Sequence, residues 1–191
     1  MLEGKTIGFG LTGSFCTLQA AIDEMEKLAA TGCKIMPVLS PNAASIDTRF
    51  GKAADFIERI EGICGCKAIT TIQDAEPIGP QKLLDIMVVM PCTGNTLAKL
   101  YNGITDTAVT MACKAHLRND RPLLLAIATN DGLSMNMRNI GGLMNLKNLY
   151  FMPFGQDDCD KKETSLIADF AKLMPSIEYA LAGKKAQPQI F

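Results

Sequence analysis

Residues 86–96 read IMVVMPCTGNT and carry the strongest fold signal in this 191-residue sequence. Residues 86–90 form a short, uninterrupted apolar run, which is typical of a strand buried on both faces of a parallel sheet. Residues 91–96 then bring a glycine, two hydroxyls and an amide together at the start of a predicted helix. This succession predicts an α/β fold in which the polar turn lies at the carboxyl edge of the sheet.

Apolar runs alternate with helical patterns on both sides of this segment, which predicts βαβ units and a mostly parallel sheet. Further strands are expected at residues 5–10, 33–39, 68–72, 123–128 and 149–152, a loop at 74–81, and helices at 14–31, 52–62, 97–101, 108–117, 135–146 and about 163–181. We therefore predict one three-layer α/β/α Rossmann-like sandwich domain over residues 1–191. The tail at 183–191 lacks a helical period and is expected to be flexible, or docked on a partner through Ile190 and Phe191.

Composition narrows the range of functions. The formal net charge is -1 and the 19 basic residues are scattered, which argues against nucleic acid as the main partner. No apolar run is long enough to cross a membrane, and no export signal precedes the first strand, so a cytoplasmic protein is expected. The seven cysteines have no CxxC spacing and the sequence has one histidine, so we expect reduced thiols and no metal site. Cys64 and Cys66 are interpreted as inert.

Three polar turns follow predicted strands, where open α/β sheets bind ligands. Residues 10–14 (GLTGS) suit an anion at a helix N-terminus, but a tight turn needs glycine in any case. Ser40, taken alone, is better explained by a plain helix cap. The turn at 93–96 favours an anion site, because Thr93 alone would serve as a cap without Asn95 and Thr96. Cys92 is interpreted as a packing residue, since no histidine stands near it in the sequence.

Residues 91–131 resemble the FMN-binding flavoprotein family that contains the homo-oligomeric flavin-containing cysteine decarboxylases and the flavin prenyltransferases. Family positions are matched in register by Thr93, Asn95, Thr96, Leu97, Ala98, Gly103 and Asp106. The resemblance implies a parallel α/β/α fold and assembly into trimers or dodecamers. It also implies an FMN held by Gly13, Ser14, Ser40, Thr93 and Thr96, with Gly94 and Asn95 close to it.

The chain departs from the family at two catalytic positions. Pro77 stands where the decarboxylases carry a catalytic histidine, and Thr129-Asn130 stands where the prenyltransferases carry an Arg-Glu pair. The segments GLTGSFCTL, VLSPNA and GLMNLKNLYFMPFGQDD resemble another branch, the dipicolinate synthase B subunits of spore-forming bacteria. That resemblance implies NADP-linked oxidation of a dihydrodipicolinate-type ring to dipicolinate during sporulation, in the mother cell. NADP would be bound through a partner, the A subunit of the same enzyme.

The turn after residues 123–128 supplies candidate substrate-binding residues: Asn130, Asn136, Arg138 and Asn139. Arg138 suits a carboxylate, although a solvated helix arginine explains it equally. Asp131, Asp157 and Asp158 are candidates for a general base but are equally explained as ordinary loop acids, and none is assigned that role. Three functions stay open: a redox protein that carries FMN, a non-catalytic binding protein with a vestigial flavin site, and a decarboxylase with relocated acid/base residues.

Overall fold

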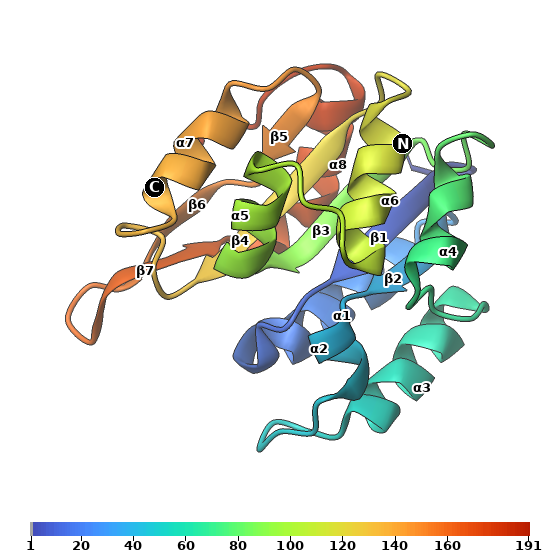
Figure 1. The fold of residues 1–191 in the computed structure, drawn as a ribbon, viewed down its shortest axis with the longest axis horizontal. Helices are drawn as coiled ribbons and strands as arrows, with labels where there is room; N and C mark the ends of the chain where they lie inside the picture. The colour runs from blue at the N-terminus through green and yellow to red at the C-terminus, as the bar shows by residue number, and fades with distance from the viewer. Residues whose placement is uncertain (1) are drawn as a thin grey trace.

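The computed structural model describes residues 2–191, and within them the chain forms a seven-stranded sheet with helices on both faces (Figure 1). The strands are β1 Thr6–Leu11, β2 Lys34–Leu39, β3 Ile86–Cys92, β4 Leu123–Thr129, β5 Leu149–Phe151, β6 Phe154–Asp158 and β7 Lys162–Ala168. The helices are α1 Phe15–Ala29, α2 Pro41–Ser45, α3 Ala53–Cys64, α4 Ile72–Ala75, α5 Gly94–Tyr101, α6 Ala108–Leu117, α7 Met137–Met144 and α8 Leu173–Leu181, with the short 3-10 helices η1 Glu76–Ile78 and η2 Phe170–Lys172.

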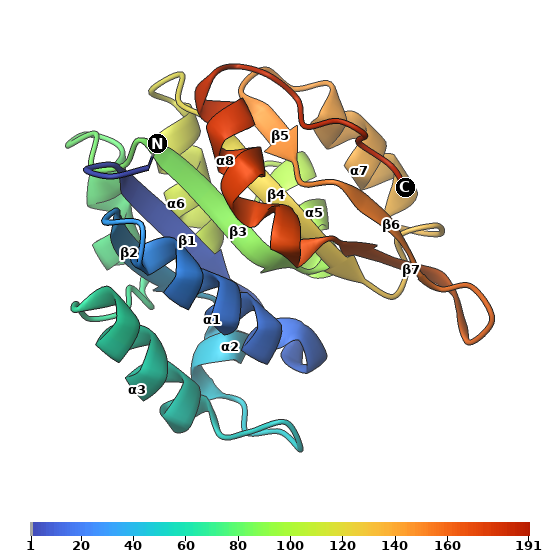
Figure 2. The same cartoon turned by 180° about the vertical axis from the view of Figure 1, so that it is seen from behind.

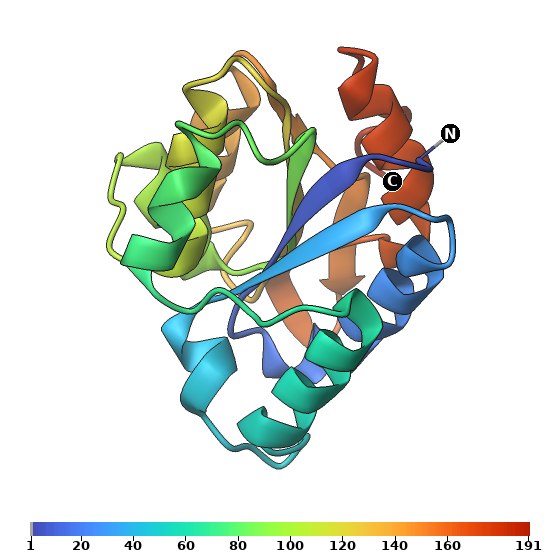
Figure 3. The same cartoon turned by 90° about the vertical axis from the view of Figure 1, so that its right-hand side faces the viewer.

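The strand order is β2-β1-β3-β4-β7-β6, and β5 also pairs with β4. Strands β1 to β5 pair in parallel, whereas β6 and β7 form an antiparallel hairpin joined to the end of β4. Helices α4 to α7 cover the face seen in Figure 1, and α1 and α8 cover the opposite face (Figure 2). Viewed from the side, these elements make three layers (Figure 3). The predicted three-layer, mostly parallel α/β/α sandwich is confirmed.

The parallel strands lie where the apolar runs predicted them. Every residue of β3 is buried, as expected for a central strand covered on both faces. The N-cap of α1 is Ser14, as predicted, but its side chain makes no capping bond and instead accepts a hydrogen bond from the Thr17 hydroxyl at 2.9 Å.

Three predicted elements are wrong. Residues 68–72 make a single bridge, Val38 to Ile69, and no strand. Residues 74–81 contain the end of α4 and η1 rather than a plain loop. The predicted helix over 163–181 begins only at Leu173, because β7 pairs with the ends of β4 and β6. That pairing is long-range and overrides local helical preference.

The C-terminal tail runs beside β6. The Phe154 N–H donates to the Gln189 carbonyl at 3.1 Å, and the Phe191 N–H donates to the Phe154 carbonyl at 3.3 Å. Ile190 and Phe191 nevertheless remain 64% and 63% exposed, so docking on a partner through them stays a prediction. None of the helices within residues 2–191 is both long and apolar enough to cross a membrane.

Candidate functional site

The turns after β1 and β3 lie against each other because Thr12 joins them. Its hydroxyl, which is buried, donates to the Pro91 carbonyl at 2.7 Å and accepts from the Thr93 N–H at 3.1 Å. Since β1 and β3 are neighbouring parallel strands, both turns emerge at the same edge of the sheet. Thr12 therefore fixes the spacing between the first turn and the polar turn that starts α5.

Two of the predicted hydroxyls are also helix caps. The Ser40 side chain accepts from the Ala43 N–H at 3.3 Å, and the Thr93 side chain accepts from the Thr96 N–H at 3.4 Å. The Thr93 and Thr96 hydroxyl oxygens lie 3.0 Å apart. A hydroxyl that accepts in a cap keeps a proton to donate, so capping and ligand binding are compatible at these residues.

A cavity of about 300 Å³, the smaller cavity, opens between the ends of β1, β2 and β3. Its walls are formed by Thr12, Gly13, Ser40, Pro41, Asn42, Thr93, Asn95, Thr96, Lys99 and Thr107. Lys99 is its one charged residue, and the ammonium lies 2.8 and 2.9 Å from the two carboxylate oxygens of Asp106. This cavity therefore offers mainly hydroxyl, amide and backbone donors.

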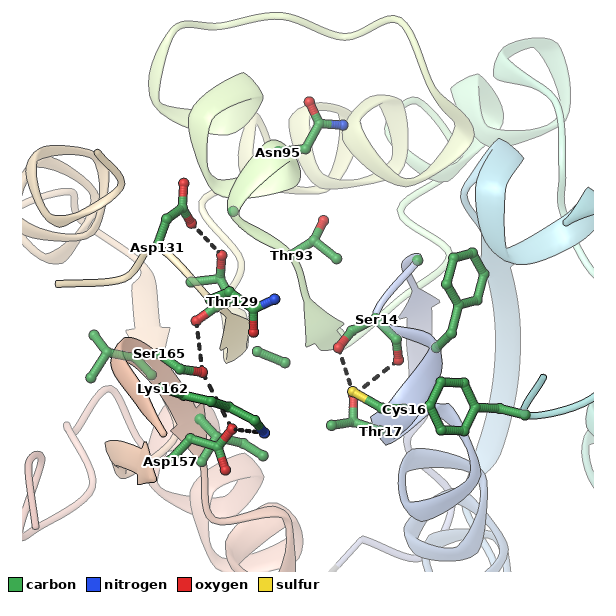
Figure 4. Close-up of a pocket in the computed structure, with 18 of the residues that line it drawn as sticks. Ser14, Cys16, Thr17, Thr93, Asn95, Thr129, Asp131, Asp157, Lys162 and Ser165 are labelled. Atoms are coloured by element: carbon green, nitrogen blue, oxygen red, sulfur yellow. Dashed lines mark hydrogen bonds and ion pairs between the residues drawn. The ribbon is translucent and has the colours of Figure 1, made fainter. Parts of the chain in front are cut away.

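A second cavity of about 600 Å³, the larger cavity, lies beside it (Figure 4). It is lined by Gly13, Ser14, Phe15, Cys16, Thr17, Arg49, Phe50, Thr93, Gly94, Asn95, Ala128, Thr129, Asn130, Asp131, Asp157, Lys162, Ser165, Leu166 and Ile167. Figure 4 shows Ser14, Cys16 and Thr17 on one side, and Asp131, Lys162 and Asp157 on the other. Both cavities share Gly13, Thr93 and Asn95 as walls, so the two cavities adjoin at the turns after β1 and β3.

A polar network holds Asp131 at the wall of the larger cavity. The Thr129 hydroxyl donates to one carboxylate oxygen at 2.6 Å, and the Asn136 amide donates to the other at 2.8 Å. Asn139 donates in turn to the Asn136 side-chain oxygen at 2.7 Å. Gly94 packs directly against this network: a Cβ there would lie 2.4 to 2.8 Å from Asn136, Thr129 and Asp131. Any larger residue at the start of α5 would therefore displace this network.

The β6–β7 hairpin supplies the charged wall of the larger cavity. The Lys162 ammonium lies 2.6 Å from the Asp157 carboxylate, and that hydrogen bond raises the pKa of Lys162. The Ser165 hydroxyl lies 3.3 Å from both the Asp157 carboxylate and the Thr129 carbonyl. Lys162 thus stays cationic at neutral pH, and the hairpin is tied to the end of β4.

The structure brings the predicted cofactor residues together. Each of Gly13, Ser14, Ser40, Thr93, Gly94, Asn95 and Thr96 lines one or both cavities. Their binding of a cofactor stays a prediction.

The predicted substrate residues are dispersed. Asn130 lines the larger cavity, whereas Asn136 and Asn139 are buried, with Asn136 bonded to Asp131 and Asn139 to Asn136. Arg138 is exposed and is not part of the walls of either cavity. Sequence reasoning missed Arg49, Phe50 and Lys162, because nothing in their local sequence marks segments that meet only in the folded chain.

Within residues 2–191 all seven cysteines are free thiols, and no group of three or more His, Cys, Asp or Glu side chains is placed to hold a metal ion. Burial raises the pKa of Cys64 to about 12, and burial also raises the pKa of Cys92 and Cys113 well above the usual range. A thiol with a raised pKa is a poor nucleophile at neutral pH. The complete burial of Cys92 agrees with a packing role.

Comparison with known proteins assigns the chain to a protein family. The flavoprotein family model matches residues 1–173, and the chain belongs to that family. It is 48% identical over 187 residues to the B subunit of dipicolinate synthase from Bacillus subtilis (strain 168), covering 98% of this chain and 94% of the relative. The resemblance predicted from the sequence is therefore confirmed.

Solved structures agree with this placement. A crystal structure of the dipicolinate synthase B subunit from Bacillus halodurans matches with a TM-score of 0.91 and 42% identity, covering 100% of this chain and 97% of the other. The FMN-dependent cysteine decarboxylase SpaF matches with a TM-score of 0.69 and 21% identity, over 95% and 98% of the two chains. At that identity the second likeness supports the fold alone.

Proposed function

We propose that this chain is the FMN-binding B subunit of a dipicolinate synthase. With a partner that binds NADP, the A subunit, it would support oxidation of a dihydrodipicolinate-type ring to dipicolinate in the cytoplasm of the sporulating mother cell. The observation that carries the proposal is the pair of adjoining cavities around Thr93 and Asn95. Family membership and similarity to dipicolinate synthase B subunits support the same assignment.

The donors of the smaller cavity fit a phosphate-bearing group. Ser40, Thr93 and Thr96 contribute hydroxyls, and the start of the eight-residue helix α5 contributes backbone N–H groups. The larger cavity, of about 600 Å³, has the Phe50 ring in its wall, and an aromatic face suits a flat ring system. We assign the phosphate and ribityl chain to the smaller cavity and the ring to the larger cavity.

Oxidation of a dihydropyridine to a pyridine removes a hydride and a proton, and FMN supplies a hydride acceptor when bound. The residues of this chain would hold and orient the reactants. Asp131 is the carboxylate of the larger cavity that has no cationic partner, since its bonds come from Thr129 and Asn136. We propose that Asp131 accepts a proton from a bound ring.

Decarboxylase chemistry of the familiar type is less well supported. Pro77, at the position of the family histidine, lies in η1 and lines neither cavity. No proton donor is available from its side chain.

The experiment is a visible spectrum of the purified protein, followed by FMN titration of the double variant Thr93→Val/Thr96→Val. Each lost hydrogen bond to a charged phosphate should cost about 1.5 to 3 kcal/mol of binding free energy. The control is Thr71→Val, which removes a similar N-cap bond from α4 at an exposed position outside both cavities. A protein that binds no FMN, as purified or after titration, would refute the proposal and support the non-catalytic binding function.

The partner and assembly have separate tests. NADP-linked ring oxidation should require both this chain and the A subunit, so each alone should give no turnover. Light scattering should give the mass of a homo-oligomer, a trimer or a dodecamer, as membership of the family implies.

A further inference from the structure

Arg49 lies at the tip of a hydrogen-bonded two-residue turn between α2 and α3. The Thr48 N–H donates to the Gly51 carbonyl at 3.0 Å, and the Gly51 N–H donates back to the Thr48 carbonyl at 3.2 Å. The Phe50 N–H donates to the Thr48 hydroxyl at 3.1 Å. A Cβ at Gly51 would lie 2.8 Å from the Phe56 ring, so the turn is packed against α3. The turn therefore presents Arg49 and Phe50 in a defined position at the larger cavity.

The Arg49 guanidinium is a cation without an acidic partner. In the chain from residue 2 to residue 191 it makes no ion pair, and its guanidinium carbon lies 4.9 Å above the centre of the Phe50 ring. Stacking on an aromatic face orients the guanidinium plane without using its five N–H donors. Those donors are available to a carboxylate in bidentate geometry.

Lys162 supplies a second cation from the β6–β7 hairpin. Its ammonium bonds to Asp157 and has three N–H donors in all, so donors remain for a ligand. Cys16 on α1 lines the same cavity as Lys162. Figure 4 shows the Lys162 side chain between Asp157 and the Cys16 side of the cavity.

We propose that Arg49 and Lys162 bind the two carboxylates of a small planar dicarboxylate in the larger cavity. The inference rests on the proposed function, because the reactant and product of that reaction are dicarboxylates. Asp131 has no cation beside it, so it repels a carboxylate and leaves that wall to the uncharged edge of the ring. Phe50, which lines the cavity and is 47% exposed, offers a face to the ring.

The test is calorimetric binding of pyridine-2,6-dicarboxylate and of pyridine-2-carboxylate to the full chain as purified. Arg49→Gln and Lys162→Gln should each weaken dicarboxylate binding on the order of 10- to 100-fold, since each removes a charge-assisted contact. Either variant should bind the two compounds with similar affinity, because only one cation remains. The matched controls are Arg118→Gln and Lys161→Gln, which change residues outside both cavities and should bind as the wild type does.

Two results would overturn the inference: unchanged selectivity for the dicarboxylate in both variants, or loss of binding with Arg138→Gln and not with Arg49→Gln. Far-UV circular dichroism of each variant establishes that it folds. Failure of the proposed function is distinguishable, because it appears in the flavin titration. FMN binding without dicarboxylate binding removes only this inference, and dicarboxylate binding through Arg49 and Lys162 without FMN removes only the cofactor assignment.

Discussion

The two cavities are built in different ways. The smaller cavity is lined mainly by residues within a few positions of the ends of β1, β2 and β3, and its one charged side chain, Lys99, is paired with Asp106. The larger cavity also takes walls from the turn at 48–51 and from the β6–β7 hairpin, and these bring in Arg49, Asp157 and Lys162. The difference shows that strand-end turns close to one another in the sheet build the smaller cavity, whereas segments distant in the sequence bring most of the charged side chains to the larger cavity.

Substitution of Gly94 should weaken ligand binding in both cavities. Gly94→Ala would push a methyl group into Asn136, Thr129 and Asp131, so we expect a loss of about 3 kcal/mol in unfolding free energy. Binding of FMN and of pyridine-2,6-dicarboxylate should fall together. Urea unfolding and the two titrations measure these effects.

The control for this change is Gly141→Ala, in α7, where a Cβ meets nothing within 4 Å. Alanine is the better helix former, so this variant should be stabilised by about 0.5 to 1 kcal/mol. If Gly94→Ala proved as stable as Gly141→Ala, the packing of α5 on the Asp131 network would be disproved.

Lowering the pH should reduce the free energy of unfolding through His116, which lines neither cavity. His116 is buried, and burial lowers its pKa from 6.5 to about 4, with its ring nitrogen 3.0 Å from the Pro122 carbonyl. Because the unfolded chain takes up this proton first, stability is complete above pH 6.5 and falls as pH drops toward 4. We expect a loss of about 2 kcal/mol between pH 7 and pH 5 from this group.

Urea unfolding at both pH values measures this loss. His116→Gln keeps a hydrogen-bonding side chain without a titrating ring, so its stability should change less over the same interval. Equal pH dependence in the variant and the wild type would show that other groups control the acid response.

Substitution of Thr12 tests whether the spacing of the turns after β1 and β3 controls ligand binding, independently of which residues the turns contain. Thr12→Val leaves the Pro91 carbonyl and the Thr93 N–H without their partner, and we expect a loss of about 1 to 2 kcal/mol in unfolding free energy. FMN affinity should fall although valine keeps the shape of threonine. Thr12→Ser retains the hydroxyl and should restore most of both quantities; a serine variant as weak as the valine variant would argue for methyl packing instead.

The smallest expected effect comes from the Lys99–Asp106 ion pair, in which the carboxylate offsets the charge of the ammonium at the smaller cavity. Asp106→Asn releases the Lys99 ammonium from its carboxylate partner, so a phosphate-bearing ligand should bind about two- to fivefold more tightly at low salt. Dicarboxylate binding in the larger cavity should not change. Titrations at low and high salt measure the difference, and a gain in dicarboxylate affinity would show that the two cavities share their electrostatics.

The parallel core could be predicted because its signal is local. An apolar run such as 86–90 has few stable environments other than a buried strand, and glycine and hydroxyl residues at its end mark a turn. The β6–β7 hairpin could not be predicted in the same way. The first residues of β7 are exposed and polar, and the strand forms because Ile167 and Leu166 pair with Ala128 and Thr129 at the end of β4.

The sequence by itself determined the three-layer fold, the family and the polar turns around Thr93, because periodicity and residue type act over a few neighbouring positions. Only the tertiary structure decided that Arg49 and Lys162 line one cavity and that Asn136 and Asn139 are buried behind Asp131. The reason is physical: Arg49 and Lys162, more than a hundred residues apart, come to one cavity only through long-range strand pairing and packing, and the burial of Asn136 and Asn139 depends on which elements pack over them. Local sequence patterns encode neither.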